Sequence, residues 1–202
     1  MAVRTHAGTD AGLGWSRASR LLHWTGAGLI AVLVALGWIM FSPLIPIALR
    51  FDLFQLHKSL GLVALALVGL RAVQAILQRR PPPRGGPVAR AAAGIVQAAL
   101  WGVMVALPLS GWATASASPL AIPIRFFGLF RVPALLAPDL ATYVTVARYH
   151  LVLGMILVGL VVVHAGAALK HHFRDRDDVL VRMLRGRPRT SIRAPTHDAN
   201  SE

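Results

Sequence analysis

Two histidines, His150 and His164, lie within one apolar stretch of the chain and are the first candidates for chemistry. They are fourteen residues apart, so an α-helix would carry both on nearly one face, about 21 Å apart along its axis. A polar side chain deep in a membrane is costly and usually faces a partner inside the protein. We therefore expect a separate partner for each histidine.

Three further side chains could complete such sites. His23 lies just inside a second apolar run and, taken alone, is either an interfacial histidine or a ligand. His57 lies about one turn inside a third run, and Arg71 follows it by fourteen residues, near the opposite end of the same run. Arg71 either reaches out to the inner membrane edge or anchors an anionic group such as a haem propionate.

The apolar runs predict an all-α protein, an integral membrane four-helix bundle, and its histidines are candidates to hold haem groups between the helices. The chain is 55% hydrophobic and 14% charged, which is typical of a membrane protein. The predicted spans are residues 21–41, 53–77, 91–112 and 143–169. Residues 21–172 form the transmembrane domain, preceded by a cytoplasmic lead (1–20) and followed by a cytoplasmic basic tail (173–202). Asp52 is expected to cap the second span, and the third supplies packing.

Two connections stand out. The stretch QRRPPPRGGPVAR at residues 78–90 is rich in proline, glycine and arginine, which predicts a cytoplasmic loop. Residues 113–138 form a long outer connection that contains IRFFGLFRVPALL. This segment is expected either to lie on the membrane surface over the outer end of the bundle or to form a merely ordered interfacial loop.

The charge distribution predicts the orientation. The formal net charge is +13, but the basic residues lie in the connections rather than on one amphipathic face, so no nucleic-acid partner is expected. Sixteen of the 21 Lys and Arg residues fall in segments on the same side as the termini, which places both termini in the cytoplasm. The absence of cysteine excludes thiolate-held iron–sulfur clusters, c-type haem and disulfides.

With this orientation the four histidines pair by depth. His23 and His164 lie toward the inner side, and His57 and His150 toward the outer side. Two imidazoles from different helices are what six-coordinate haem iron requires. The spacing alone also leaves open a metal or proton path and unlinked structural histidines, although a proton path usually employs Asp or Glu, and zinc or copper transport favours carboxylate, Cys or Met helpers.

Several motifs together resemble those of the bacterial cytochrome b561 family. They are RLLHW at 20–24, HKSLGL at 57–62 with Arg71 downstream, RRPPP at 79–83, ALPLSGW at 106–112, RYHLVLG at 148–154, VVVHAGAALKHHF at 161–173 and DDVLVRML at 177–184. The resemblance covers about residues 15–185. It is to the small, stand-alone four-helix form, similar to superoxide oxidase, rather than to the longer cytochrome b subunit of nickel-iron hydrogenases.

The resemblance implies a bacterial inner-membrane protein with two haem b groups, whose iron is bound by His23, His57, His150 and His164. It also implies electron exchange with ubiquinone, with superoxide or another periplasmic molecule as donor, and thus either a superoxide:ubiquinone oxidoreductase or an electron-transfer cytochrome. The outer basic residues Lys58, Arg125, Arg131 and Arg148 would attract an anionic donor.

The alternative is a haem-bearing membrane anchor that relays electrons for a periplasmic dehydrogenase. The sequence makes no prediction about the oligomeric state or the quinone site. His6, His171, His172 and His197 are expected to be solvated or interfacial.

Overall fold

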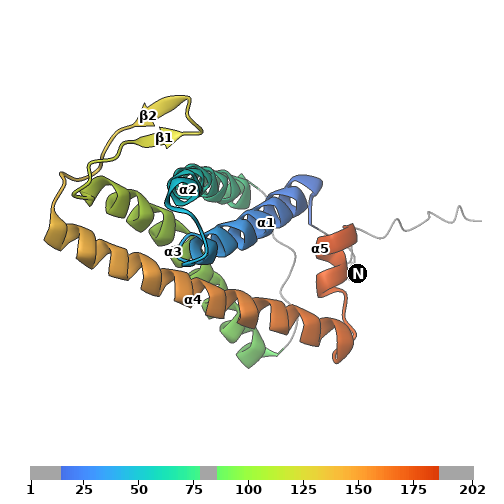
Figure 1. Ribbon diagram of the computed structural model, residues 1–202. Helices are drawn as coiled ribbons and strands as arrows, with labels where there is room; N and C mark the ends of the chain where they lie inside the picture. The colour runs from blue at the N-terminus through green and yellow to red at the C-terminus, as the bar shows by residue number, and fades with distance from the viewer. Residues whose placement is uncertain (1–14, 78–85, 187–202) are drawn as a thin grey trace, which may run out of the picture.

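The computed structural model describes residues 15–77 and 86–186. Within them the chain forms four long helices, a short β-hairpin and a short final helix. Their bounds are α1 (Arg17–Ile39), α2 (Ile47–Leu77), α3 (Pro87–Ala117), β1 (Ile124–Phe126), β2 (Phe130–Val132), α4 (Leu140–Phe173) and α5 (Val179–Arg185) (Figure 1).

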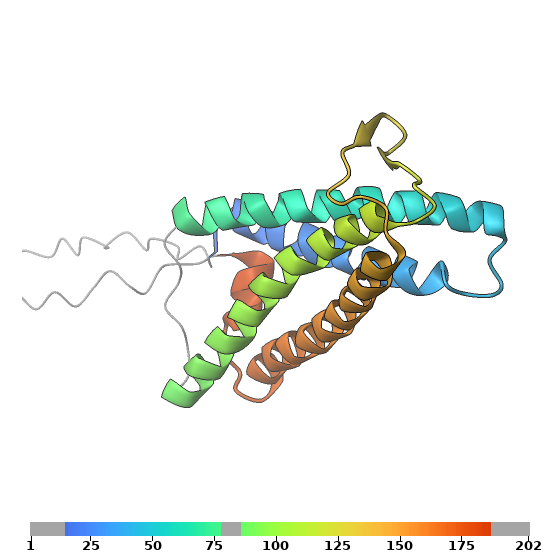
Figure 2. The ribbon, with the colours of Figure 1, turned by 90° about the vertical axis from the view of Figure 1, so that its left-hand side faces the viewer.

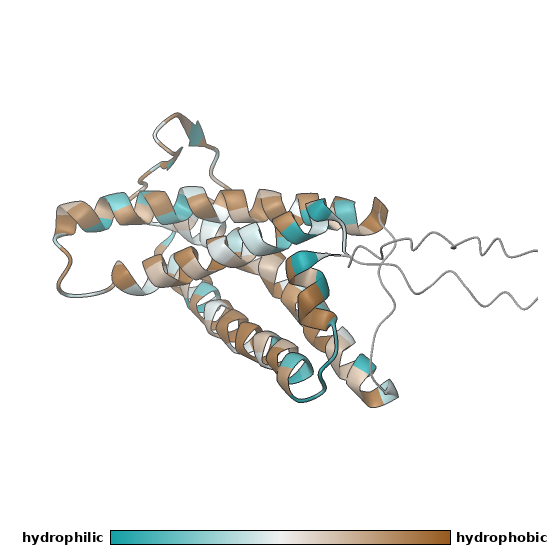
Figure 3. Ribbon diagram, turned by 90° about the vertical axis from the view of Figure 1, so that its right-hand side faces the viewer, coloured by the Kyte–Doolittle hydropathy of each residue, from teal (hydrophilic) through white to brown (hydrophobic). Residues whose placement is uncertain are grey.

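Each of the four long helices has the length and composition to cross a membrane. A helix satisfies its backbone hydrogen bonds internally, as hydrocarbon requires. Few apolar side chains are buried within the chain itself, whereas many are exposed, among them Leu21, Trp38 and Val162. Figure 3 shows apolar residues along all four long helices, and both hydrophilic and apolar residues in α5. An apolar surface of this extent suits contact with lipid, and the predicted all-α membrane bundle is confirmed.

The helices form two antiparallel pairs, α1 with α2 and α3 with α4. Figure 2 shows the pairs converging where α3 ends and α4 begins, and diverging toward the end that carries α5. We call these two ends the hairpin end and the α5 end. At the α5 end, Arg20 donates to the Leu184 carbonyl (2.9 Å) and Trp24 donates to the Met183 carbonyl (3.2 Å), which attaches α5 to α1.

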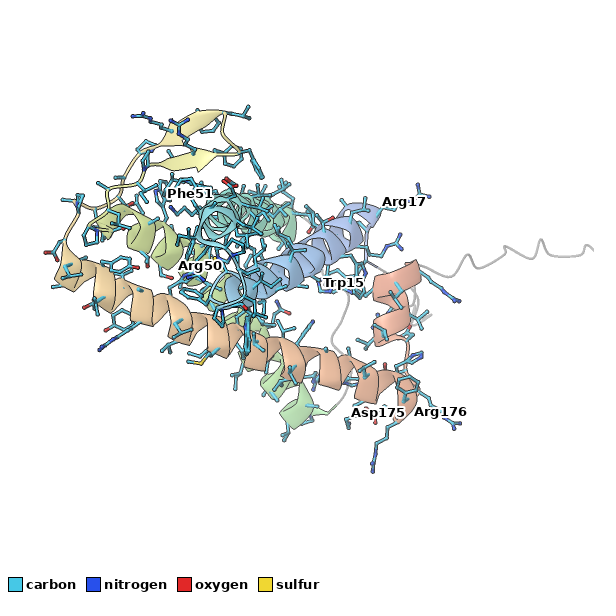
Figure 4. The ribbon with its side chains drawn as sticks, viewed as in Figure 1. Trp15, Arg17, Arg50, Phe51, Asp175 and Arg176 are labelled. Carbon is cyan, nitrogen blue, oxygen red and sulfur yellow. The ribbon has the colours of Figure 1, made fainter. Side chains whose placement is uncertain are left out.

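Two helix starts differ from the sequence expectations. α2 begins at Ile47, so Asp52 lies inside the helix and does not cap it. Arg50 in the first turn (Figure 4) instead donates to the carbonyls of Ser42 (3.1 Å) and Ile45 (3.2 Å), which closes the turn after α1. α3 begins at Pro87, within the predicted loop, because proline is well accepted at a first helical position. The RRPPP motif lies outside the described residues.

The predicted outer connection is more ordered than the sequence suggested. α3 continues to Ala117, and the chain then forms the β-hairpin. Hydrogen bonds hold this connection to both α2 and α3. Ser59 of α2 accepts a hydrogen bond from the Phe127 N–H (3.0 Å), and Gln55 donates to the Pro123 carbonyl (3.1 Å). Trp112 of α3 donates to the Pro133 carbonyl (2.9 Å).

The predicted basic tail also contains structure. After α4 the chain turns at Asp175 and Arg176 (Figure 4) and forms the separate helix α5. The residues of the tail from 187 onward, like those of the lead from 1 to 14, lie outside the described part of the chain.

Candidate functional site

The first imidazole pair lies toward the hairpin end and joins α2 to α4. The ring centroids of His57 and His150 are 6.3 Å apart, and the ring planes are inclined by 83°. Gln55 and Ser59, on either side of His57 in the sequence, bind the β-hairpin. Because residues two apart on a helix point in nearly opposite directions, His57 faces away from the hairpin and toward α4.

The His150 ring is held by α3. Its Nδ1 lies 3.1 Å from the Leu107 carbonyl oxygen and 3.0 Å from Ser110 Oγ. The Ser110 hydroxyl donates to that same carbonyl at 2.8 Å. A carbonyl only accepts, so Nδ1 carries the proton in this arrangement, and the unprotonated Nε2 is left to bind a metal.

The His57 ring has a different environment. Its Nδ1 is buried and has no hydrogen-bond partner among the described residues. A Cβ added at Gly37 of α1 would lie 3.8 Å from His57 Cε1, an ordinary contact distance. Thus α1 packs beside this ring without bonding to it, and the two imidazoles of the pair are held unequally.

The second pair lies toward the α5 end and joins α1 to α4. The ring centroids of His23 and His164 are 6.2 Å apart, and the ring planes are inclined by 61°. The ring of Trp24 lies edge-on to His23, with centroids 5.1 Å apart. The same Trp24 binds the α5 backbone, so the position of α5 is linked to this site.

Arg71 points into the second pair rather than to the membrane edge. Its Nη2 lies 3.0 Å from His23 Nδ1. A guanidinium group only donates hydrogen bonds, so Nδ1 of His23 accepts and the proton lies on Nε2. A His23 that binds iron through Nε2 must carry its proton on Nδ1 instead, and the Arg71 guanidinium is then available for an anion.

The dimensions of both pairs fit a haem iron bound from two sides. A metal-bound imidazole nitrogen lies about 2.0 to 2.1 Å from a first-row metal, so two rings on opposite sides have centroids roughly 6 Å apart. The observed values are 6.3 and 6.2 Å. In the described part of the chain, no three His, Cys, Asp or Glu side chains cluster as metal ligands. The geometry therefore suits a planar ring with two axial ligands better than a multi-ligand metal site.

The other histidines lie elsewhere. His171 Nδ1 is 2.6 Å from Asp177 Oδ2 and 3.3 Å from Asp175 Oδ2, so it is paired with acids in the turn before α5 rather than simply solvated. The ring of His172 lies edge-on to Phe173. His6 and His197 lie outside the described residues.

Sequence reasoning missed the groups of α3 that hold His150. Ser110 and the Leu107 carbonyl make the contacts, and Gly111 leaves room for the ring. All three lie in the ALPLSGW motif, which was noted for its resemblance and not for a contact. The signal was a hydroxyl beside a glycine in an otherwise apolar span.

Comparisons with known proteins agree with this arrangement. A family model described as prokaryotic cytochrome b561 matches residues 14–186. The chain is 33% identical to "Cytochrome b561 homolog 2" of Escherichia coli (strain K12), over 82% of this chain and 88% of the relative. It is 29% identical to "Probable superoxide oxidase CybB" of Yersinia pestis, over 81% of this chain and 91% of the relative.

Proposed function

The chain belongs to the prokaryotic cytochrome b561 family of haem b-binding membrane cytochromes, and on this premise we propose that it carries electrons across the bacterial inner membrane to or from the quinone pool. Two haem b groups would be held by His57 with His150 and by His23 with His164. The observation that carries the proposal is that these two cross-helix pairs have nearly equal ring separations, 6.3 and 6.2 Å.

The chain's own residues bind and orient the haem. Each pair supplies one imidazole from α4 and one from a helix of the α1–α2 pair. Leu107 and Ser110 fix the tautomer of His150 that can bind iron through Nε2. A haem ligated on both sides supplies one-electron transfer. Arg71 would bind a propionate, because its guanidinium lies beside His23 and carries a permanent charge.

The proposed orientation places the hairpin end outside and the α5 end, with both termini, in the cytoplasm. The support is the distribution of basic residues, since sixteen of the 21 Lys and Arg residues lie in segments on the side of the termini. The β-hairpin then lies at the periplasmic surface beside the His57–His150 pair, and α5 lies at the cytoplasmic surface.

Superoxide is the proposed donor and ubiquinone the proposed acceptor. In the balanced reaction two superoxide anions lose one electron each and become two molecules of oxygen. One ubiquinone gains the two electrons and two protons and becomes ubiquinol. The exposed Arg125, Arg131 and Arg148 near the hairpin end would attract the anionic donor. The printed name of the Yersinia pestis relative supports the same substrate.

A reduced-minus-oxidised visible spectrum with a count of haem per chain tests the proposal. The unaltered protein is expected to hold two haem b groups. His57→Ala and His23→Ala should each leave one, because each removes a ligand from a different pair, and His172→Ala is the matched control that should leave two. Retention of both haems after either substitution would contradict the pairing, and a spectrum without b-type bands would support a haem-free protein.

A haem-bearing anchor for a periplasmic dehydrogenase is the second candidate. It is favoured by the exposed hairpin residues Phe127, Leu129 and Phe130, which could contact a soluble partner. Formation of ubiquinol by the isolated protein with superoxide would support the oxidoreductase. Reduction of its haem only with a copurifying dehydrogenase would support the anchor.

A further inference from the structure

We propose that the β-hairpin lies in the lipid headgroup layer at the side of α2, where Arg125 and Arg131 together bind the phosphate group of an anionic phospholipid. Neither haem nor quinone is required for this contact. The partner of the hairpin is then a lipid rather than a soluble protein.

The hairpin stands beside α2 rather than over the end of the bundle. The backbone of β1 faces α2, since Ser59 Oγ lies 3.2 Å from the Arg125 carbonyl oxygen and accepts from the Phe127 N–H (3.0 Å). β2 pairs with β1. Ser59 lies about 18 Å along the axis from the start of α2 at Ile47. Figure 1 shows the hairpin to one side of α2, and Figure 2 shows α2 continuing past it, so the hairpin projects sideways from the bundle.

The α2 residues that bond the hairpin lie at one edge of a predicted membrane span. Gln55 and Ser59 are among the first residues of the span 53–77, so the hairpin lies at the level where hydrocarbon gives way to headgroups. Backbone polar groups at this level require protein partners, because hydrocarbon offers none. Gln55 donates to the Pro123 carbonyl (3.1 Å), and its Oε1 accepts from the Arg125 N–H (3.5 Å). The polar side chains of α2 therefore allow the hairpin backbone to lie beside lipid.

The two faces of the hairpin differ in character. Side chains alternate between the faces of a strand, and cross-strand partners share a face. Ile124 and Phe126 lie on one face with Phe130, where Ile124 is 4% exposed and the two phenylalanine rings stack with centroids 5.1 Å apart. The cross-strand partners Arg125 and Arg131 lie on the opposite face, and both are exposed. The hairpin therefore has an apolar face and a cationic face, as amphipathic segments at a membrane surface do.

Arg125 and Arg131 are placed to bind one anion between them. Directly opposed residues have Cβ atoms about 4.5 to 5.5 Å apart, so both guanidinium groups can reach the same phosphate and donate paired hydrogen bonds to it. Like charges at opposed positions destabilise a strand pair, and a bound phosphate removes this repulsion. In the described part of the chain, neither guanidinium forms an ion pair with an acid. The counter-ion is therefore expected to come from outside these residues.

The exposed turn of the hairpin favours a lipid over a free anion. Phe127, Leu129 and Phe130 are 47%, 78% and 57% exposed. Aromatic rings are enriched at the headgroup level of membranes, and basic residues at that level are attracted to anionic lipids. A free phosphate ion would contact the arginines only, whereas a phospholipid also covers these apolar side chains.

A bound lipid is compatible with the attraction of an anionic electron donor to the same end. Two guanidinium groups carry two positive charges and a phosphodiester carries one negative charge, so one positive charge remains. Arg148 on α4 is exposed and is not part of the hairpin. The donor is thus still attracted, with less force than by the lipid-free protein.

A nitroxide label on the hairpin tests its position. The chain contains no cysteine, so Leu129→Cys gives a single labelling site in the holoprotein, which is placed in nanodiscs of phosphatidylglycerol and phosphatidylcholine. Collisions of the label with oxygen, which concentrates in hydrocarbon, and with a water-soluble nickel chelate report its depth. Val162→Cys, at an exposed position inside the span of α4, is the hydrocarbon reference. Arg176→Cys, at an exposed position in the turn before α5, is the water reference.

The label at Leu129 is expected to fall between the two references, with more oxygen collisions and fewer nickel collisions than the label at Arg176. Equal accessibility of these two labels to nickel would overturn the lipid contact and would leave the hairpin free for a soluble partner. This measurement needs no arginine substitution, so it does not depend on how such variants fold.

Calorimetric titration of the detergent-solubilised holoprotein with short-chain phosphatidylglycerol and with phosphatidylcholine of the same chain length tests the arginine pair. Phosphatidylglycerol is expected to bind more tightly, on the order of 10-fold. Arg125→Gln with Arg131→Gln should abolish most of this preference, and Arg125→Lys with Arg131→Lys should retain part of it. Arg90→Gln with Arg176→Gln is the matched control, which removes the same charge from the opposite end and should keep the preference.

Three results would overturn the assignment of the arginine pair. The first is equal binding of the two lipids by the unaltered protein. The second is an equal loss of preference in the hairpin variant and in the control variant, which would assign the effect to net charge. The third is inorganic phosphate that binds as tightly as phosphatidylglycerol, which would make the site one for a free anion.

Discussion

Gly111 of α3 lies directly against the His150 ring of α4. A Cβ added at Gly111 would be 2.9 Å from His150 Cε1 and 3.2 Å from Nδ1. Carbon atoms of real side chains do not approach so closely, so only glycine at this position lets the ring lie against α3. The same close approach brings Nδ1 within hydrogen-bonding distance of the Leu107 carbonyl. The position of one proposed iron ligand therefore depends on a residue with no side chain.

Gly111→Ala is expected to displace the His150 ring and remove the haem at the hairpin end. Forcing an extra methyl group into a packed contact costs about 1 to 3 kcal/mol, and the displaced ring also loses its contact with Leu107. The haem count should fall from two per chain to one. Gly102→Ala on the same helix is the control, because a Cβ there meets nothing within 4 Å. Two haems per chain in the Gly111→Ala variant would contradict this prediction, because the haem would then bind despite the displaced His150 ring.

Ser59→Ala is expected to release the β-hairpin from α2. Ser59 is 1% exposed, and its Oγ accepts from the Phe127 N–H at 3.0 Å. The hydrogen bond is partly buried, and the loss of an intramolecular hydrogen bond costs about 0.5 to 1.5 kcal/mol. Trypsin should then cleave faster after Arg125 and Arg131. Thr145→Val is the control, because that exposed hydroxyl bonds within its own helix. Equal cleavage rates in Ser59→Ala and the unaltered protein would contradict this role.

The sequence was sufficient to predict the four helices because each apolar run is long enough to cross a membrane. The fourteen-residue spacing placed His150 and His164 on nearly one face of a helix, and the predicted orientation paired each of them with the histidine at the same depth in another span. The structure places these rings together, and their role as iron ligands stays a prediction. The resemblance to the cytochrome b561 family is confirmed by the family match.

The contacts between helices could not be predicted in the same way. Ser110 meets His150 because α3 crosses α4 at a particular register, and apolar periodicity does not determine that register. Arg71 had two interpretations because a long side chain near a helix end can reach either lipid headgroups or a neighbouring helix. The choice depends on where α1 places His23.

The β-hairpin was missed because its strands are too short for an alternating pattern. Each strand has three residues, and the turn between them places Phe127 (φ 47°) and Gly128 (φ 78°) at its centre. Such turns usually carry Asn-Gly or Asp-Gly. A phenylalanine at positive φ is unusual, so the local sequence gave no turn signal.

Acid is expected to weaken the start of α4 through Asp139. Hydrogen bonds from the Thr142 side chain and backbone hold the pKa of Asp139 below its ordinary value of 3.8. A lowered folded-state pKa contributes stability that is present above the unfolded-state value and lost as the pH falls through the folded-state value. The unfolding temperature should therefore fall between about pH 5 and about pH 2.

The Asp139→Asn variant distinguishes the contribution of the carboxylate charge from that of the helix-capping hydrogen bond. Asparagine also caps helices well, so this variant should fold at neutral pH but lose less stability in acid than the unaltered protein. Asp139→Ala should unfold at a lower temperature already at neutral pH. Identical acid profiles for the Asn variant and the unaltered protein would assign the acid sensitivity to other groups.

Neutralising Arg125 and Arg131 is expected to slow reduction by superoxide. The two residues are cross-strand partners in the β-hairpin, and both are exposed. If they attract an anionic donor, Arg125→Gln with Arg131→Gln should lower the second-order rate on the order of 2- to 10-fold at low ionic strength. The salt dependence of the rate should weaken as well, because less charge remains to be screened. Arg90→Gln with Arg176→Gln is the control, since it removes the same charge from the opposite end of the bundle. Equal slowing by both pairs would indicate an effect of net charge alone, and no slowing by either would argue against superoxide as the donor.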